Sequence, residues 1–147
     1  MGYTNYWYQK RAFTDAEWSK IKDYIYKECD QNIIYIRFSS LYSYNAKQFE
    51  NKASQTLQRC IEILSPNYDD VIEFNGQGSQ SCENFTLYKN IREPRYEDEN
   101  VIFNCCKTRQ HPYDEVVWEV LKFIKFVVLD PKDKSFSISN DNGDNYE

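Results

Sequence analysis

Apolar residues recur every three or four positions in three segments of the chain, which is the spacing of one helical face. The first segment predicts a helix over residues 15–29, which begins at the capping-box sequence Thr14-Asp-Ala-Glu17. The second predicts a helix from Asn45 to Ser65-Pro66, because proline disfavours α geometry in the residue before it. The third predicts a helix from Pro112 to Val128, with the broadest apolar face of the three.

Shorter segments are rich in β-branched and aromatic residues or alternate with a period of two, which is typical of strands. Two of them flank the turn that starts at Gly76 and predict a hairpin. Consecutive strands in the middle of the chain favour antiparallel pairing. We therefore expect an α+β fold, with a mostly antiparallel sheet of about five to six strands and three helices packed mainly on one face. The expected strands cover residues 2–8, 32–38, 71–75, 84–88, 100–106 and 135–139.

The length of 147 residues is typical of one domain, and 41% hydrophobic residues are enough for a core. We expect a single domain over residues 1–139, followed by an acidic, frayed tail over residues 140–147.

Net charge and hydropathy exclude several classes of partner. The net charge is −5, which disfavours a non-specific nucleic-acid binder because an acidic surface repels phosphates. The most hydrophobic stretch, residues 116–129, is interrupted by charged side chains, and residues 1–10 lack the apolar core of a signal peptide. We expect no membrane association and a cytoplasmic location.

The cysteines predict free thiols and no metal site. Their number is odd, none has the C-x-x-C spacing, and His111 is the sole histidine. We predict no metal and no cofactor. The five cysteines are Cys29, Cys60, Cys82, Cys105 and Cys106.

The segment from Phe103 to Asp114 carries the clearest candidate chemistry. It runs from a predicted strand into the third helix and is basic until Asp114. Free N–H groups at a helix start favour anions, so this segment predicts an anion site; the alternative is a solvated loop that balances nearby acids. The candidate ligand-binding residues are Lys107, Thr108, Arg109 and Tyr113, with Asn75 and Tyr6 opposite.

Cys106, Lys107 and His111 are the candidates for thiol chemistry. No complete set of nucleophile, base and orienting residue is visible. The sequence therefore names no catalytic residue and favours a non-enzymatic protein.

Several sequence blocks together resemble a family of small uncharacterised proteins found in bacteriophages, bacteria and large DNA viruses. The resemblance implies a viral or phage-type gene product, which would act in the host cytoplasm or the virion, and it implies no activity. Arg109-Gln110-His111 departs from the family, which has a small residue and more positive charge there. The blocks are Gly2-Tyr3-Thr4-Asn5-Tyr6-Trp7, Phe74-Asn75-Gly76, Glu83 with Phe85, Phe103-Asn104-Cys105-Cys106-Lys107-Thr108, Pro112-Tyr113-Asp114 and, more loosely, Ser139 to Gly143.

Three functions remain open from the sequence. The leading hypothesis is a binding domain for an anionic small molecule such as a nucleotide. The second is a structural or protein-interaction subunit, with a protein partner or self-association, because tyrosine-rich surfaces are typical of interfaces. The third is a thiol-dependent enzyme.

Overall fold

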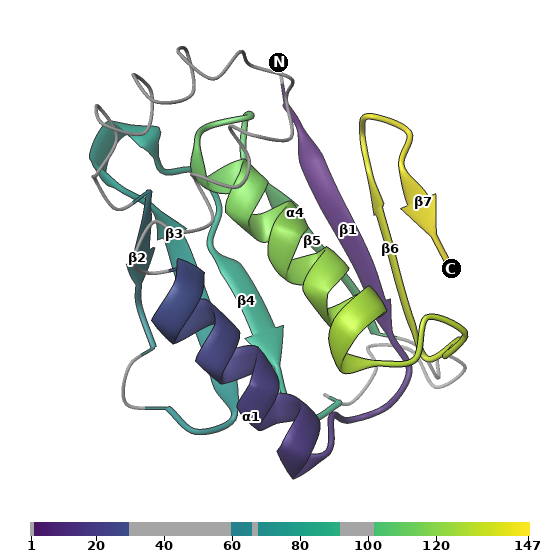
Figure 1. Cartoon of the computed structure of the whole chain (residues 1–147). Coiled ribbons are helices and arrows are strands. Elements are labelled where there is room, and N and C mark those ends of the chain that lie inside the picture. Colours follow the sequence, from purple (N-terminus) through teal and green to yellow (C-terminus); the bar gives the residue numbers. More distant parts are fainter. Residues whose placement is uncertain (1, 30–59, 66–67, 92–101) are drawn as a thin grey trace, which may run out of the picture.

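The computed structural model describes residues 2–29, 60–65, 68–91 and 102–147. Within these ranges the chain has an α+β fold, with two helices and two antiparallel sheets. Figure 1 shows both helices on the same side of the strands. One sheet has the order β5-β1-β6-β7, formed by Ile102–Lys107, Thr4–Gln9, Phe136–Asn140 and Asn145–Tyr146. The other has the order β2-β3-β4, formed by Ile61–Ile63, Val71–Gly76 and Phe85–Tyr88.

The first and last predicted helices are confirmed. Helix α1 (Asp15–Asp23) starts with the expected capping box, since Thr14 Oγ1 accepts from the Glu17 N–H and the Glu17 carboxylate accepts from the Thr14 N–H. It continues as a π-helical turn over Tyr24–Cys29. Helix α4 (Tyr113–Phe123) continues in the same way over Ile124–Val128.

The core lies between these helices and the two sheets. The inner face of α4 is fully buried, including Val116, Val120 and Leu121. Trp7 of β1 meets Phe85 of β4 with their ring centroids 5.0 Å apart, so aromatic side chains fill the space where the two sheets adjoin. The predicted hairpin is present, because β3 and β4 pair in antiparallel register.

The prediction of one continuous sheet is wrong. Strand β1 pairs with β5 and β6, and β3 pairs with β2 and β4, so the strands form two separate ladders. At one end of β4 the sheets meet through the Glu83 N–H, which donates to the Lys107 carbonyl at 3.0 Å. Alternation along a strand indicates which face is buried, but it carries no information about which edges pair.

The end of the second predicted helix is also wrong. Residues 30–59 lie outside the described ranges, and so do the predicted strand over residues 32–38 and most of this helix. Residues 61–63 are described, and they form β2, in which Ile61 pairs with Gly76 and Ile63 pairs with Phe74. Two β-branched isoleucines flanking Glu62 suit a strand, and pairing with β3 outweighs the helical spacing.

The last eight residues complete the first sheet. Asn140 ends β6, and its side chain accepts from the N–H groups of Asn142 and Asp144 across a turn. Residues 145–146 then pair with β6 as β7. The segment predicted as a frayed acidic tail therefore contributes an edge strand.

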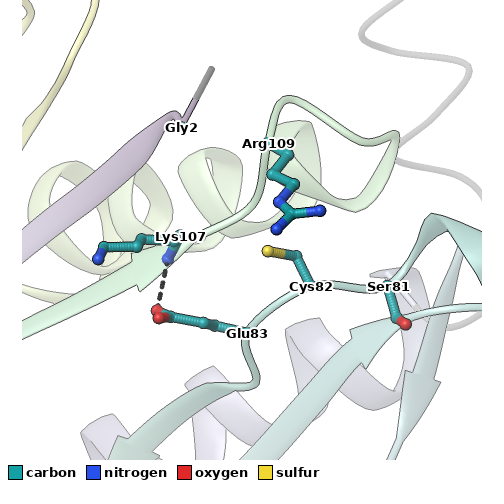
Figure 2. A pocket seen from close by; sticks show the side chains of 6 residues that line it. All are labelled: Gly2, Ser81, Cys82, Glu83, Lys107 and Arg109. Atoms are coloured by element: carbon teal, nitrogen blue, oxygen red, sulfur yellow. Dashed lines mark hydrogen bonds between the residues drawn. The ribbon is translucent and has the colours of Figure 1, made fainter.

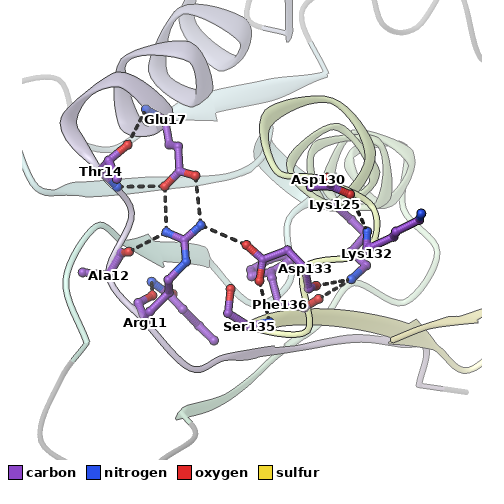
Figure 3. A network of polar contacts seen from close by, with 11 residues as sticks. Arg11, Ala12, Thr14, Glu17, Lys125, Asp130, Lys132, Asp133, Ser135 and Phe136 are labelled. Carbon is purple, nitrogen blue, oxygen red and sulfur yellow. Dashed lines mark hydrogen bonds and ion pairs between the residues drawn. The ribbon is translucent and has the colours of Figure 1, made fainter.

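A polar network ties the start of α1 to the start of β6 (Figure 3). Arg11 donates to both Glu17 carboxylate oxygens, at 2.8 and 3.0 Å, and to Asp133 at 3.0 Å. Lys125 is 1% exposed and donates to the Asp133 and Phe136 carbonyls at 2.8 Å each. The network holds these elements together on the side of the molecule opposite residues 103–114, the segment that carries the candidate chemistry.

Candidate functional site

The loop between β5 and α4 holds the basic residues in an unusual backbone conformation. Arg109 and Gln110 have φ angles of 54° and 56°, in the left-handed region that residues other than glycine rarely adopt. Such a conformation persists only where the surroundings enforce it, and it is found often at functional sites.

Buried hydrogen bonds of Thr108 and Asp114 hold the loop in this conformation. Thr108 is fully buried; its N–H donates to the Tyr3 carbonyl at 2.9 Å, and its hydroxyl donates to Asp114 Oδ1. The same carboxylate oxygen accepts from Asn5 Nδ2 at 2.7 Å. Burial raises the pKa of Asp114, while the bonds from Thr108 and Asn5 lower it. Thr108 is thus an anchor of the loop rather than a group that faces a ligand.

Asn75 anchors the opposite loop, residues 77–84, through both ends of its side-chain amide. Its Oδ1 accepts from the N–H groups of Gly76 and Cys82, at 2.7 and 3.0 Å. Its Nδ2 donates to the Cys82 carbonyl at 3.0 Å and to Asn84 Oδ1 at 2.7 Å. These four bonds hold the loop in one shape and use both donor hydrogens and both acceptor lone pairs of the side-chain amide.

Glu83 joins the two loops. Its Oε2 accepts from the Lys107 N–H at 2.9 Å, as Figure 2 shows, and its own N–H donates to the Lys107 carbonyl. The Tyr113 hydroxyl, fully buried, donates to the Glu83 carbonyl at 2.8 Å. Tyr113 therefore supports the contact between Glu83 and Lys107.

A pocket of about 660 Å³ opens between the two loops. Figure 2 shows the Arg109 guanidinium directed toward Cys82, while the Lys107 ammonium points the other way. The carboxylate on the wall, Glu83, already accepts the hydrogen bond from Lys107. The lining residues are Gly2, Ser81, Cys82, Glu83, Lys107 and Arg109.

The structure brings together only part of the predicted ligand-binding set. Lys107 and Arg109 line the pocket, whereas Thr108, Tyr113 and Asn75 brace its walls. Tyr6 lies on the outer face of β1, and its hydroxyl donates to Asp141 Oδ1 at 2.8 Å.

Four lining residues were absent from the predicted set: Gly2, Ser81, Cys82 and Glu83. The sequence offered signals for two of them, because Gly2 and Glu83 belong to the blocks that carry the family resemblance. Ser81 and Cys82 lie beyond the turn at Gly76, and their place in the pocket depends on how Asn75 folds that loop back.

The two adjacent cysteines face opposite sides of the sheet. Cys105 is exposed, and Cys106 is fully buried and donates to the Glu83 carbonyl at 3.5 Å. Burial raises the pKa of the Cys106 thiol well above its usual range, and the nearby Glu83 carboxylate raises it further. A thiol in that environment stays protonated and is a poor nucleophile.

Within the described residues, no group of three or more His, Cys, Asp or Glu side chains is placed to hold a metal ion. In the same part of the chain, no helix has both the length and the apolar character needed to cross a bilayer.

Comparison with known proteins adds no identification, since the chain matches no family model, no curated protein and no solved structure. The resemblance to the phage, bacterial and viral family therefore stays a prediction. Among the described residues, its central blocks are contiguous in space: Asn75, Gly76, Glu83, Lys107, Thr108, Tyr113 and Asp114 form the walls and supports of the pocket.

Proposed function

We propose that the protein binds a small anionic ligand, such as a nucleotide, in the pocket between residues 77–84 and 107–112. The observation that carries the proposal is the placement of Arg109. Its left-handed backbone is held by the buried Thr108–Asp114 contact, and its guanidinium extends over the pocket toward Cys82. A guanidinium presented on a fixed loop suits phosphate groups, because less conformational entropy is lost on binding.

The charge of the Arg109 guanidinium suits the same class of ligand. Arg109 directs its guanidinium over the pocket, while the Lys107 ammonium points the other way, and Glu83 adds one carboxylate to the wall. One oxygen of the Glu83 carboxylate already accepts a hydrogen bond from the Lys107 backbone N–H. Arg109 thus offers a local cation in a chain with a net charge of −5.

A thermal-shift screen against nucleotides, cyclic dinucleotides and simple phosphates tests the proposal. A ligand at about 100 times its dissociation constant adds roughly 2.7 kcal/mol, which raises the melting temperature by several degrees. We expect Arg109→Ala to abolish this rise. The matched control is Lys20→Ala, which removes an exposed cation from α1 outside the pocket and should leave the rise unchanged. A flat screen, or an equal rise in Arg109→Ala, refutes the proposal.

Protein interaction is the second candidate function, and a different surface favours it. Phe126 and Tyr146 are each 40% exposed, and Val127 is 64% exposed, at the end of α4 and beside β7. The Phe126 and Tyr146 rings meet edge to face with centroids 5.0 Å apart. If this patch binds a protein, then Val127→Asp should abolish capture of that protein without altering the ligand-induced shift.

A further inference from the structure

Three aromatic rings form a cluster on the outer face of the β5-β1-β6 sheet. Phe103 is 50% exposed and Tyr8 is 41% exposed. The Phe103 ring centroid lies 5.0 Å from that of Tyr8 and 5.9 Å from that of Tyr6. Side chains alternate along strands, so these rings face away from the core side that buries Trp7 and Cys106. Tyr6, Tyr8 and Phe103 are called the aromatic platform below.

Small side chains surround the aromatic platform. Tyr8 lies opposite Ser137 in the register of β1 with β6, and Tyr6 lies opposite Ser139. On the β5 side, Tyr6 lies opposite Cys105. Because these neighbours are short, the rings are the bulkiest groups of this part of the sheet face. Exposed apolar patches on proteins often mark binding sites.

Cations stand at both ends of the aromatic platform. Lys107 pairs with Thr4, two residues before Tyr6, and its ammonium points away from Arg109 in Figure 2. Lys10 follows Tyr8 by two residues, and its N–H still pairs with the Ser135 carbonyl at 2.8 Å, so the alternation places its side chain on the same face.

The carboxylate beside the platform is already engaged. Asp141 accepts from the Tyr6 hydroxyl at 2.8 Å and from the Thr4 N–H at 2.9 Å. Its charge is therefore partly satisfied within the protein, and the two lysines at the ends leave this face complementary to phosphates on either side of the rings.

We propose that the aromatic platform binds unpaired bases of a single-stranded nucleic acid, with Lys10 and Lys107 receiving the flanking phosphates. Every base offers a π-face, and stacking on aromatic side chains of an open sheet is the general way in which proteins hold unpaired bases. This inference goes beyond the pocket and does not depend on it.

The net charge of −5 opposes binding driven by phosphate contacts. The aromatic platform would instead gain most of its affinity from base stacking. Binding through stacking has a shallow salt dependence. Two phosphate contacts to a single strand predict a slope of log K against log salt of about −1.4, and Lys10→Ala should reduce that slope by about 0.7. A slope steeper than about −3 would show binding dominated by phosphates elsewhere on the surface and overturn the proposal.

The direct test is fluorescence anisotropy of a labelled short oligothymidylate, titrated with the full 147-residue chain. Loss of one stacked base weakens binding by about 5- to 150-fold, and we expect a change of this size for Phe103→Ala. Phe103→Tyr keeps a ring and should retain binding. The matched control, Tyr68→Ala, removes a 63% exposed tyrosine on the chain between β2 and β3 and should have no effect.

Two further outcomes separate this proposal from its alternatives. Arg109→Ala should leave oligothymidylate binding unchanged, and a loss there would assign the binding to the pocket and refute the platform. Sedimentation of the protein without nucleic acid tests for a second copy on this face. A dimer that Phe103→Ala dissociates, with no oligothymidylate binding by the wild type, would overturn the proposal in favour of self-association. A monomer that binds the oligonucleotide only with the rings intact supports it.

Discussion

At the scale of a single residue, Gly76 decides whether the loop over residues 77–84 can close. A Cβ atom at this position would lie 2.3 Å from the Gln80 carbonyl oxygen and 2.8 Å from Cδ1 of Tyr113. The φ angle of Gly76 is not in the left-handed region, so the requirement for glycine comes from space alone. The absence of a side chain at Gly76 lets the loop backbone lie directly against β3 and the Tyr113 ring.

Gly76→Ala should therefore destabilise the fold by about 3 kcal/mol, because the added methyl meets a backbone atom that cannot rotate away. The free energy of unfolding from urea denaturation measures the change. Gly2→Ala is the matched control, since a Cβ there has no atom within 4 Å, and it should alter stability by less than about 0.5 kcal/mol. Equal stabilities for the two variants would contradict the close approach of Gln80.

At the scale of elements, one junction connects the two sheets beside the pocket. Glu83 precedes β4, and Lys107 ends β5; two hydrogen bonds link them. Tyr113, the first residue of α4, supports both, because its hydroxyl lies 2.8 Å from the Glu83 carbonyl and 3.3 Å from the Lys107 carbonyl. A single phenol thus links α4, β4 and β5.

Tyr113→Phe should loosen this junction while leaving the ring in the core. Loss of one buried hydrogen bond costs about 1 kcal/mol of unfolding free energy. We also expect faster amide hydrogen exchange at Glu83 and Lys107, with unchanged exchange in the centre of α4. Tyr68→Phe removes a hydroxyl from a 63% exposed side chain and serves as the control. Unaltered exchange at Glu83 and Lys107 would show that the hydroxyl does not support the junction.

The elements themselves were predictable wherever their signals are local. The Thr14–Glu17 capping box, the apolar face of α4 and the β3–β4 hairpin depend on neighbouring residues, and the structure confirms all three. The division into two sheets was not predictable, because it depends on which edges pair across long sequence separations. Strand β2 was missed for a different reason, since Ile61 also fits the helical spacing of the apolar residues before it, and its pairing with β3 decides the outcome.

The candidate site was predictable to a similar extent. Basic residues before a helix indicated Lys107 and Arg109, and both line the pocket. Thr108 and Tyr113 belong to the same segment, but their side chains point inward. The Thr108 hydroxyl donates to Asp114, and the Tyr113 hydroxyl donates to the Glu83 carbonyl. The opposite wall, at Ser81, Cys82 and Glu83, follows from the tertiary position of the loop, which no local pattern contains.

At the scale of the whole molecule, the core holds ionisable groups that must stay neutral. Cys106 is fully buried, and burial raises the pKa of its thiol. Burial also raises the pKa of Cys60 to about 11, and partial burial outside the core raises the pKa of Tyr3 to about 12. Burial lowers the pKa of Lys125, which changes stability with pH in the opposite direction. The stability of the fold in alkaline solution therefore depends on the balance of these groups.

For the thiols the sign is fixed. The unfolded chain loses the proton of a cysteine near pH 8.5, while folded Cys106 keeps it, so its contribution to stability is complete below that pH and is lost as the pH rises toward its folded pKa. Each such thiol lowers the unfolding free energy by about 1.4 kcal/mol per pH unit above about pH 9. Urea denaturation from pH 7 to 10.5 should show a shallower decline for Cys106→Ala than for the wild type. Cys105→Ala, one residue earlier on the exposed face, should follow the wild-type profile. Lys125, Cys60 and Tyr3 are the same in all three proteins, so they do not cause a difference between the profiles. Parallel profiles for Cys106→Ala and Cys105→Ala would contradict the prediction, because Cys106 would then ionise as readily in the folded protein as in the unfolded chain.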